Sequence, residues 1–334
     1  MDGHYVGRVA DEDPLHAMLS RIVVERCGVE HPAGFRAFRL HGSNEVYGYE
    51  ECVSGTRLIG KFFGRRFGWD RDRAVSKAGR EFASYETLRG YQLVGTPHHV
   101  VRPLGLERDI NCVLVLEYYG GESLCSAIAR GLHGDHDHLF GRLTALSYYL
   151  ATQHNRTADG AAVDFGTDLA YLDRLLDALR VTGRLGAWDA DEIGWLAQLW
   201  SLRPRMWADR QVWLHGDATP ANFLFGAGLD VGAIDLERMR RGDRVFDVGR
   251  VAGELQHAFL RATGSREGAE PFIGHFLWEY CCHFPDREAA FASVTARVPF
   301  HMATNLLRIA RNAYVDPPYA ARLVAQAKEL LRTP

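Results

Sequence analysis

The sequence lacks the features that mark several common protein classes. No apolar run approaches the ~18 residues of a membrane-spanning helix, and the acidic N-terminus has no apolar core typical of a secretory signal. The six cysteines include no C-x-x-C pair, so neither a zinc ribbon nor a thioredoxin-like site is supported. The net charge is only −3, which argues against a nucleic-acid partner. These absences favour a cytoplasmic protein with no membrane partner.

The composition is that of an ordinary folded protein. Of 334 residues, 47% are hydrophobic and 24% are charged, which excludes extensive disorder. The chain is also longer than a typical domain with a single hydrophobic core, so we expect two lobes.

The first third of the chain is expected to be rich in β-structure after an initial helix. Apolar residues at helical spacing predict a helix over 11–30, within an N-terminal helical segment at 1–34. Short β-rich runs separated by glycines follow over 35–116, interrupted by a predicted helix over 75–88. We expect 35–116 to form a small lobe.

The remainder of the chain, 117–334, is expected to be mainly helical. Leucines recur at helical spacing through most of it, and a small β-like patch lies between 212 and 234. The predicted fold class is therefore α+β, with a small β-rich N-terminal lobe and a larger helical C-terminal lobe. A cleft between two such lobes is a usual place for a ligand.

The most informative stretch is a polar loop between two short β-like runs, with the sequence H-G-D-A-T-P-A-N. Asp217 and Asn222 lie five residues apart on this loop, and Asp235 ends the next run. An Asp and an Asn that converge with a second Asp offer hard oxygen ligands that suit Mg²⁺, and a further Asp nearby can accept a proton from a substrate hydroxyl. Phosphoryl transfer needs this combination of a metal clamp and a base.

The pattern H-G-D-x-x-x-x-N followed by I-D resembles the aminoglycoside phosphotransferase and choline kinase family, whose fold is that of protein kinases. The resemblance implies that Asp217 is the catalytic base and that Asn222 and Asp235 bind Mg²⁺. It further implies ATP as co-substrate and a protein-kinase-like fold of two lobes. It extends over roughly 35–250.

Two other parts of a kinase-like lobe are present in the β-rich region. Gly42 and Ser43 belong to a stretch that resembles the family's nucleotide loop, where backbone N–H groups and a small hydroxyl approach phosphate oxygens. Lys61 lies on a strand-like run, and the following helix offers Glu81 as its partner. Glu86 is the alternative partner, and we prefer Glu81.

The run before residue 117 resembles the last strand of that lobe and the hinge that follows it. In the family, backbone atoms of the hinge meet the adenine. By position these belong to Glu117 and Tyr119.

Three departures from protein kinases favour a small-molecule acceptor. About 60 residues separate the helix ending near His154 from the polar loop, and the extra segment, 155–211, is expected to be a helical insertion. Asp235 and Asp247 are only 12 positions apart, too few for an activation segment, and no A-P-E motif follows. We expect the insertion and the helices from 254 onward to wall the acceptor site.

The charge of the C-terminal helices argues against a polycationic acceptor. Residues 275–312 include four basic and three acidic side chains, whereas a site for a multiply charged amine should have an excess of acidic ones. We therefore expect a neutral or anionic acceptor, and Arg297, Arg308 and Arg311 are the candidates for contacting it.

The sequence thus predicts an ATP-dependent kinase that transfers the γ-phosphate to a hydroxyl of a small metabolite or antibiotic. A protein kinase and a non-catalytic, kinase-like nucleotide-binding module are the alternatives. The short segment after Asp235 disfavours the first, and the presence of all the polar parts disfavours the second.

Overall fold

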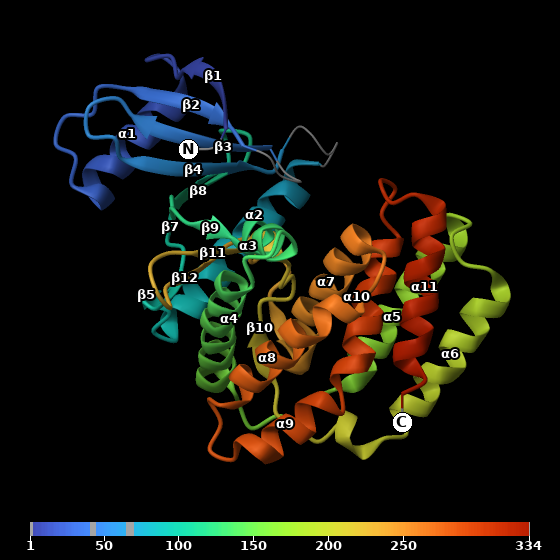
Figure 1. Ribbon diagram of the computed structural model, residues 1–334. Helices are drawn as coiled ribbons and strands as arrows, with labels where there is room; N and C mark the ends of the chain where they lie inside the picture. The colour runs from blue at the N-terminus through green and yellow to red at the C-terminus, as the bar shows by residue number, and fades with distance from the viewer. Residues whose placement is uncertain (1–2, 41–44, 65–69, 334) are drawn as a thin grey trace. The chain divides into compact units, whose positions relative to one another are not determined.

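The computed structural model describes residues 3–40, 45–64 and 70–333 (Figure 1). Contacts within the chain divide it into two compact units. The first unit consists of Met1–Gly95, His99–Gly120 and Gly232–Glu237, and the second of Thr96–His98, Gly121–Val231 and Arg238–Pro334. In the described part of the chain, no helix has both the length and the apolar character needed to cross a lipid bilayer.

The first unit is built on a six-stranded antiparallel sheet with the strand order β1-β2-β3-β4-β8-β7. Its strands are β1 (His4–Arg8), β2 (Phe35–Arg39), β3 (Glu45–Glu51), β4 (Arg57–Phe62), β7 (Pro103–Glu107) and β8 (Val113–Glu117). Two helices accompany them, α1 (Pro14–Cys27) and α2 (Arg71–Gly90). The short strands β5 (Val94–Gly95) and β6 (His98–Val100) lie between α2 and β7 along the chain.

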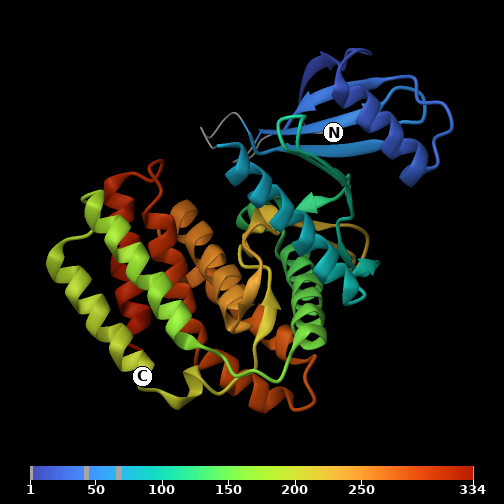
Figure 2. The ribbon, with the colours of Figure 1, turned by 180° about the vertical axis from the view of Figure 1, so that it is seen from behind.

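Helix α1 lies across one face of this sheet (Figure 2). It begins where the Asp13 side chain accepts the backbone N–H of Leu15, and it ends at Gly28, whose φ of 73° is left-handed. Its buried stripe packs against apolar side chains of the sheet, and consists of Leu15, Met18, Leu19, Ile22 and Val23. The helix predicted over 11–30 is confirmed, with shorter ends.

Successive side chains of strand β4 point to opposite faces of the sheet, and one of these faces is apolar. Leu58 and Phe62 belong to the core beneath α1. Because side chains of a strand point to opposite faces in turn, Lys61 projects from the other face, and it is buried there. Helix α2 packs on the sheet through β7 and β8.

Strand β1 is the main difference from the sequence-based expectation. Residues 4–8 fall in the segment expected to be helical, yet they pair with β2 at the edge of the sheet. Their side chains are almost all exposed, so they carry no apolar pattern that would predict a strand. Pairing of the backbone with β2 determines their conformation.

The second unit is mainly helical. Its helices are α3 (Leu124–Leu132), α4 (His136–Thr157), α5 (Phe165–Val181), α6 (Ala187–Ser201), α7 (Val245–Thr263), α8 (Glu270–Cys281), α9 (Arg287–Thr295), α10 (Val298–Ala310) and α11 (Pro317–Leu331). Its short strands form two antiparallel pairs, β9 (Glu122–Ser123) with β11 (Phe223–Phe225) and β10 (Val212–Leu214) with β13 (Arg240–Gly242). Strand β12 (Val231–Ala233) runs from the second unit into the first.

The helices of the predicted insertion, α5 and α6, share one core with α10 and α11. Leu172, Leu175, Leu176 and Leu179 supply the buried stripe of α5. At its start the Asp164 side chain accepts the backbone N–H of Gly166, which fixes the first turn. Helix α5 is therefore firmly anchored, with its opposite face exposed.

A buried carboxylate stabilises the turn after β3 in the first unit. Glu51 accepts the backbone N–H of Ala33 at 2.7 Å. It also accepts the backbone N–H groups of Val53 and Ser54. Burial alone would raise the pKa of Glu51, but these backbone hydrogen bonds lower it to about 2.

The Glu51→Gln variant is expected to lose about 2 kcal/mol of unfolding free energy at neutral pH, because an amide cannot accept from donors on both of its terminal atoms. A carboxyl whose pKa is lowered on folding stabilises the protein above its unfolded pKa, and that contribution disappears as the pH falls. The loss should therefore shrink between about pH 4.5 and about pH 2. Urea unfolding followed by circular dichroism at several pH values measures both effects.

Glu86→Gln, at an exposed position of α2, is the matched control and should change stability by less than about 0.5 kcal/mol. If the Glu51 and Glu86 variants have equal stabilities at neutral pH, the Glu51 carboxylate does not hold the turn.

Candidate active site

The first unit brings Lys61 of β4 together with Glu81 of α2. The Lys61 Nζ lies 2.9 Å from each carboxylate oxygen of Glu81. It also lies 2.7 Å from Oδ1 of Asp235. Glu86, the alternative partner, is exposed on α2. Lys61 and Glu81 are 20 positions apart in the sequence. The predicted pairing of the strand lysine with the helix glutamate is thus confirmed as a contact.

The Lys61 ammonium is buried beside acidic groups. Burial acts to lower the pKa of Lys61, but the negative charges of Glu81 and Asp235 outweigh it and raise the pKa above its ordinary value. A buried charge is tolerated only where such partners compensate it. The position of Lys61 is therefore fixed by two carboxylates.

Tyr85 connects Glu81 to the backbone of Asp235. Its hydroxyl accepts the backbone N–H of Asp235 at 2.9 Å and donates to Oε1 of Glu81 at 3.3 Å. Asp235 has a φ of 62°, a left-handed conformation that costs energy for a residue with a side chain. Sequence reasoning missed Tyr85, although it lies one helical turn after Glu81 and so on the same face.

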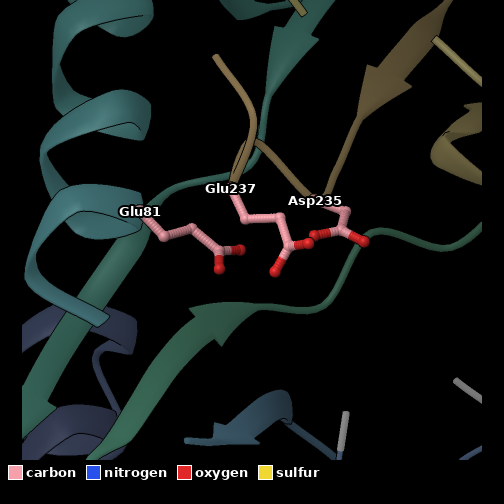
Figure 3. Close-up of side chains that lie close together, drawn as sticks. All are labelled: Glu81, Asp235 and Glu237. Atoms are coloured by element: carbon pink, nitrogen blue, oxygen red, sulfur yellow. The ribbon is translucent and has the colours of Figure 1, made fainter. Parts of the chain in front are cut away.

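Three carboxylates meet at this point of the first unit (Figure 3). Oxygen atoms of Glu81, Asp235 and Glu237 lie within 4.8 Å of one another. Lys77 offsets part of their charge, since its Nζ lies 2.9 Å from Oε2 of Glu237. Of the three side chains, that of Asp235 is the most exposed, at 27%, so it is the one most accessible to a metal ion from solvent.

The predicted hinge residues are Glu117, the last residue of β8, and Tyr119 just after it in the same unit. The backbone N–H of Glu117 donates to the carbonyl of Arg102, and its carboxylate contacts the ring of His99. Burial acts to raise the pKa of Glu117, but the His99 contact and the Arg102 N–H lower it overall. The Tyr119 ring stacks on His99 at 5.4 Å. Gly42 and Ser43, predicted for the nucleotide loop, lie outside the described residues.

The polar loop lies in the second unit, between β10 and β11. Its Gly216 has a φ of 78°, and a Cβ at this position would lie 2.0 Å from the carbonyl oxygen of Arg238. Only glycine is compatible with such an approach. The Asn222 amide nitrogen donates to the carbonyl of Asp217 at 2.9 Å, closing the loop.

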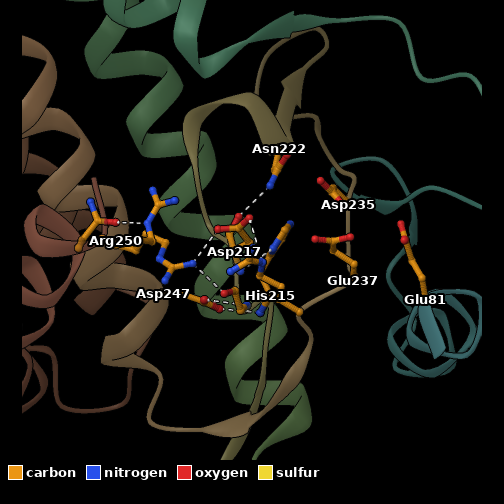
Figure 4. A network of polar contacts seen from close by, with 12 residues as sticks. Glu81, His215, Asp217, Asn222, Asp235, Glu237, Asp247 and Arg250 are labelled. Carbon is orange, nitrogen blue, oxygen red and sulfur yellow. Dashed lines mark hydrogen bonds and ion pairs between the residues drawn. The ribbon is translucent and has the colours of Figure 1, made fainter. Parts of the chain in front are cut away.

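Asp247, on the first turn of α7, anchors this loop (Figure 4). Its buried carboxylate accepts the backbone N–H groups of His215 at 2.6 Å and Gly216 at 3.0 Å. His154 contacts the same carboxylate at 3.3 Å. Burial acts to raise the pKa of Asp247, but the His154 contact and the backbone donors lower it overall. Asp247 thus ties the polar loop to helix α7.

Two arginines hold the carboxylate of Asp217. Nη1 of Arg250 lies 2.7 Å from Oδ1 and also donates to the carbonyl of Gly216, and Nε of Arg238 lies 3.7 Å from Oδ2. The Asp217 side chain remains 16% exposed. Sequence reasoning missed both arginines. Arg250 follows Asp247 by three positions on α7, a spacing that places both on one helix face.

Two of the three arginines expected to contact the acceptor form ion pairs within the second unit. Arg297 is buried and pairs with Asp209 and Asp243, so it neutralises interior carboxylates. Arg308 pairs with Glu254. The expectation for Arg297 is therefore wrong, because a fully buried guanidinium with two carboxylate partners has no exposed surface for a ligand.

Comparison with known proteins identifies relatives of this chain. The model of the "Phosphotransferase enzyme family" matches residues 39–289. No curated protein sequence matches the chain.

Solved structures resemble the chain over nearly its whole length. The ADP-bound aminoglycoside phosphotransferase APH(2'')-Ib is 13% identical, with 94% of this chain and 97% of that one covered and a TM-score of 0.55. The ethanolamine kinase of Plasmodium vivax is 10% identical, with 97% of this chain and 90% of that one covered and a TM-score of 0.60. The amicoumacin kinase hAmiN is 13% identical, with 88% of this chain and 87% of that one covered and a TM-score of 0.59. These similarities confirm the predicted α+β, protein-kinase-like fold.

Asp247→Asn is expected to destabilise the second unit by about 2 kcal/mol, because one backbone N–H of the loop would then face an amide NH₂ and remain buried without an acceptor. Thermal unfolding should show a midpoint lower by several degrees. Asp173→Asn, at an exposed position of α5, is the control and should leave the midpoint unchanged. Equal midpoints for the two variants would show that the carboxylate of Asp247 does not support the loop.

Proposed function

Because the chain belongs to the phosphotransferase enzyme family, we propose that it is an ATP-dependent kinase that transfers the γ-phosphate to a hydroxyl of a small molecule. The observation that carries the proposal is the buried ion pair of Lys61 with Glu81. Kinases use such a lysine to bind the nucleotide phosphates and such a glutamate to hold it in place. A structural role alone would not require a buried ammonium in this strand.

Asp217 is the proposed catalytic base. In the reaction the acceptor oxygen attacks the γ-phosphorus, the bond from that phosphorus to the bridging oxygen breaks, and ADP leaves. The proton of the acceptor hydroxyl passes to the Asp217 carboxylate. Arg250 and the loop backbone hold that carboxylate in place, which supports a role in positioning the acceptor.

Asn222 and Asp235 are the proposed ligands of Mg²⁺. Both offer the oxygen donors that this cation prefers. The Asn222 amide donates through its nitrogen to Asp217, which leaves its oxygen as a ligand atom. The carboxylate of Asp235 is partly exposed, and its backbone is held in a strained conformation of the kind found at functional sites. When bound, Mg²⁺ would neutralise charge on the nucleotide phosphates.

The remaining contacts with ATP are proposed for the first unit. Gly42 and Ser43 would approach the phosphates, and the backbone of Glu117 and Tyr119 would meet the adenine. The acceptor would then bind to the second unit, which carries Asp217.

A small-molecule acceptor fits the chain better than a protein. Helix α7 begins at Val245, only ten positions after Asp235, and strand β13 occupies part of that interval. The interval is too short for the activation segment with which protein kinases bind peptides. The similar solved structures include kinases whose names specify aminoglycosides, ethanolamine or amicoumacin.

Asp217→Asn should lower kcat by about 10²- to 10⁴-fold, because an amide cannot accept the hydroxyl proton. ATP affinity, measured by isothermal titration calorimetry, should stay within about twofold, since the change retains the size of the side chain. Asp173→Asn is again the control. Near-normal turnover of the Asp217 variant would exclude this residue as the base.

Asp235→Ala should weaken binding of ATP in the presence of Mg²⁺ by about tenfold or more, because a metal ligand is removed. Binding of ATP in the presence of a chelator should change much less. Titration calorimetry under both conditions makes the comparison within one variant, so loss of the contact with Lys61 affects both measurements. Equal losses with and without Mg²⁺ would argue against a metal ligand at Asp235.

A further inference from the structure

A cavity of about 210 Å³ adjoins the polar loop within the second unit. Three elements and the loop itself form its walls. The lining residues are Thr167, Tyr171 and Arg174 of α5, Gly216 of the loop, Arg238 and Arg240 around the start of β13, and Phe246 and Arg250 of α7. Its volume is below the ~300–1,000 Å³ typical of sites for drug-sized ligands, which favours a small compound.

The cavity is strongly cationic. Four of its eight lining residues are arginines, and within the described part of the chain none of the residues lining it is acidic. Two carboxylates reach these arginines from outside the lining: Asp217 contacts Arg250 and Arg238, and Asp168 pairs with Arg240 at 2.7 Å. Since arginine stays protonated in proteins, these carboxylates offset only part of the positive charge of the four guanidinium groups.

Arg174 differs from the other three arginines of the cavity, which lie near carboxylates. Among the residues that the structure describes it forms no ion pair, and its guanidinium lies 5.8 Å from the ring of Tyr171. It projects from the exposed face of α5, whose other face is packed in the core shared with α6, α10 and α11. Its backbone is therefore fixed while its charge is available to a ligand.

An aromatic ring holds two of the other three guanidinium groups in place. The ring of Phe246 contacts two of them, with Arg240 4.4 Å and Arg250 4.8 Å from its centroid. Arg250 also donates to the hydroxyl of Tyr171 at 3.3 Å. Planar guanidinium groups fixed in this manner bind carboxylate and phosphate oxygens through paired hydrogen bonds and lose little freedom in doing so.

The cavity is directly connected to the proposed base. Gly216 and Arg250 line it, and both belong to the contacts that hold Asp217. An anion bound in the cavity would thus belong to a molecule whose other end can approach the Asp217 carboxylate.

Resting on the proposed function, we propose that the acceptor is a small hydroxyl compound that carries a carboxylate or phosphate group, and that Arg174, Arg238 and Arg240 bind this group. An amine placed among these guanidinium groups would be repelled, and a neutral alcohol would leave the charge of Arg174 without a counter-charge. The cavity thus selects against polycationic acceptors. Arg174 is the specificity-determining residue that can be changed without touching the base.

The test uses the full-length protein and matched sets of three- to six-carbon hydroxyl compounds. Each set contains the neutral alcohol and its carboxylate, phosphate-ester and amine derivatives, for example glycerol, glycerate, glycerol 3-phosphate and 3-aminopropane-1,2-diol. Phosphorylation with Mg·ATP is followed by mass spectrometry, and binding by calorimetry. We expect a carboxylate or a phosphate ester to be the best ligand and acceptor in its set, and the ranking of these two identifies the anionic group.

Arg174→Gln should raise the Kd and KM for the best anion about tenfold and leave those for the neutral alcohol unchanged, because one charged hydrogen-bond donor is lost. Arg174→Lys should restore part of the loss. Arg180→Gln, at an exposed position of the same helix, is the matched control and should have no effect.

The outcomes separate this inference from the kinase assignment. If anions bind in a manner that depends on Arg174 but no compound is phosphorylated, the proposed function fails and the anion site stands. If amines or neutral alcohols are the preferred acceptors, if no anion binds, or if Arg174→Gln and Arg180→Gln behave alike, the anion site is overturned and the kinase assignment is judged on turnover alone.

Discussion

The carboxylate of Asp247 holds the polar loop by accepting two consecutive backbone N–H groups, those of His215 and Gly216, while it is itself completely buried. A buried carboxylate is stable only if donors surround it, so the contact restrains helix and loop equally. Asp217 follows directly, and Arg250, one turn along α7, holds its side chain. A single helix thus fixes both the backbone of the loop and the direction of the proposed base.

The first unit uses the same principle with the opposite charge at its centre. Lys61 is buried because Glu81 and Asp235 surround it, and Tyr85 then links the two acidic residues. In both units one buried charge organises a set of polar groups that an apolar core could not have ordered. Removal of the central charge would leave its partners buried without compensation, which is the more costly arrangement.

From the sequence, spacing singled out Asp217, Asn222 and Asp235 as candidates, and the strand and helix patterns singled out Lys61 and Glu81. The structure confirms that Lys61 and Glu81 are in contact. Arg238 and Arg250 were missed because their contacts with Asp217 depend on how β13 and α7 pack beside the loop, and no local pattern encodes that.

The arginines of the C-terminal helices illustrate a second limit of sequence reasoning. Their charge balance drew attention to Arg297, which neutralises Asp209 and Asp243 in the interior. Burial and pairing separate a structural arginine from one that faces a cavity, and both depend on tertiary structure. Strand β1 was missed for a similar reason, since its pairing with β2 is its only signal.

Helix α5 contributes three of the eight residues around the cationic cavity, and none of these three lies in the loop that holds Asp217. Its fold depends on leucines that face away from the cavity. The exposed side chains of this helix can therefore be replaced without loss of the leucines that hold it in the core. Such replacements would change the charge and shape of the cavity, while the buried contacts of Asp247 with the polar loop stay the same.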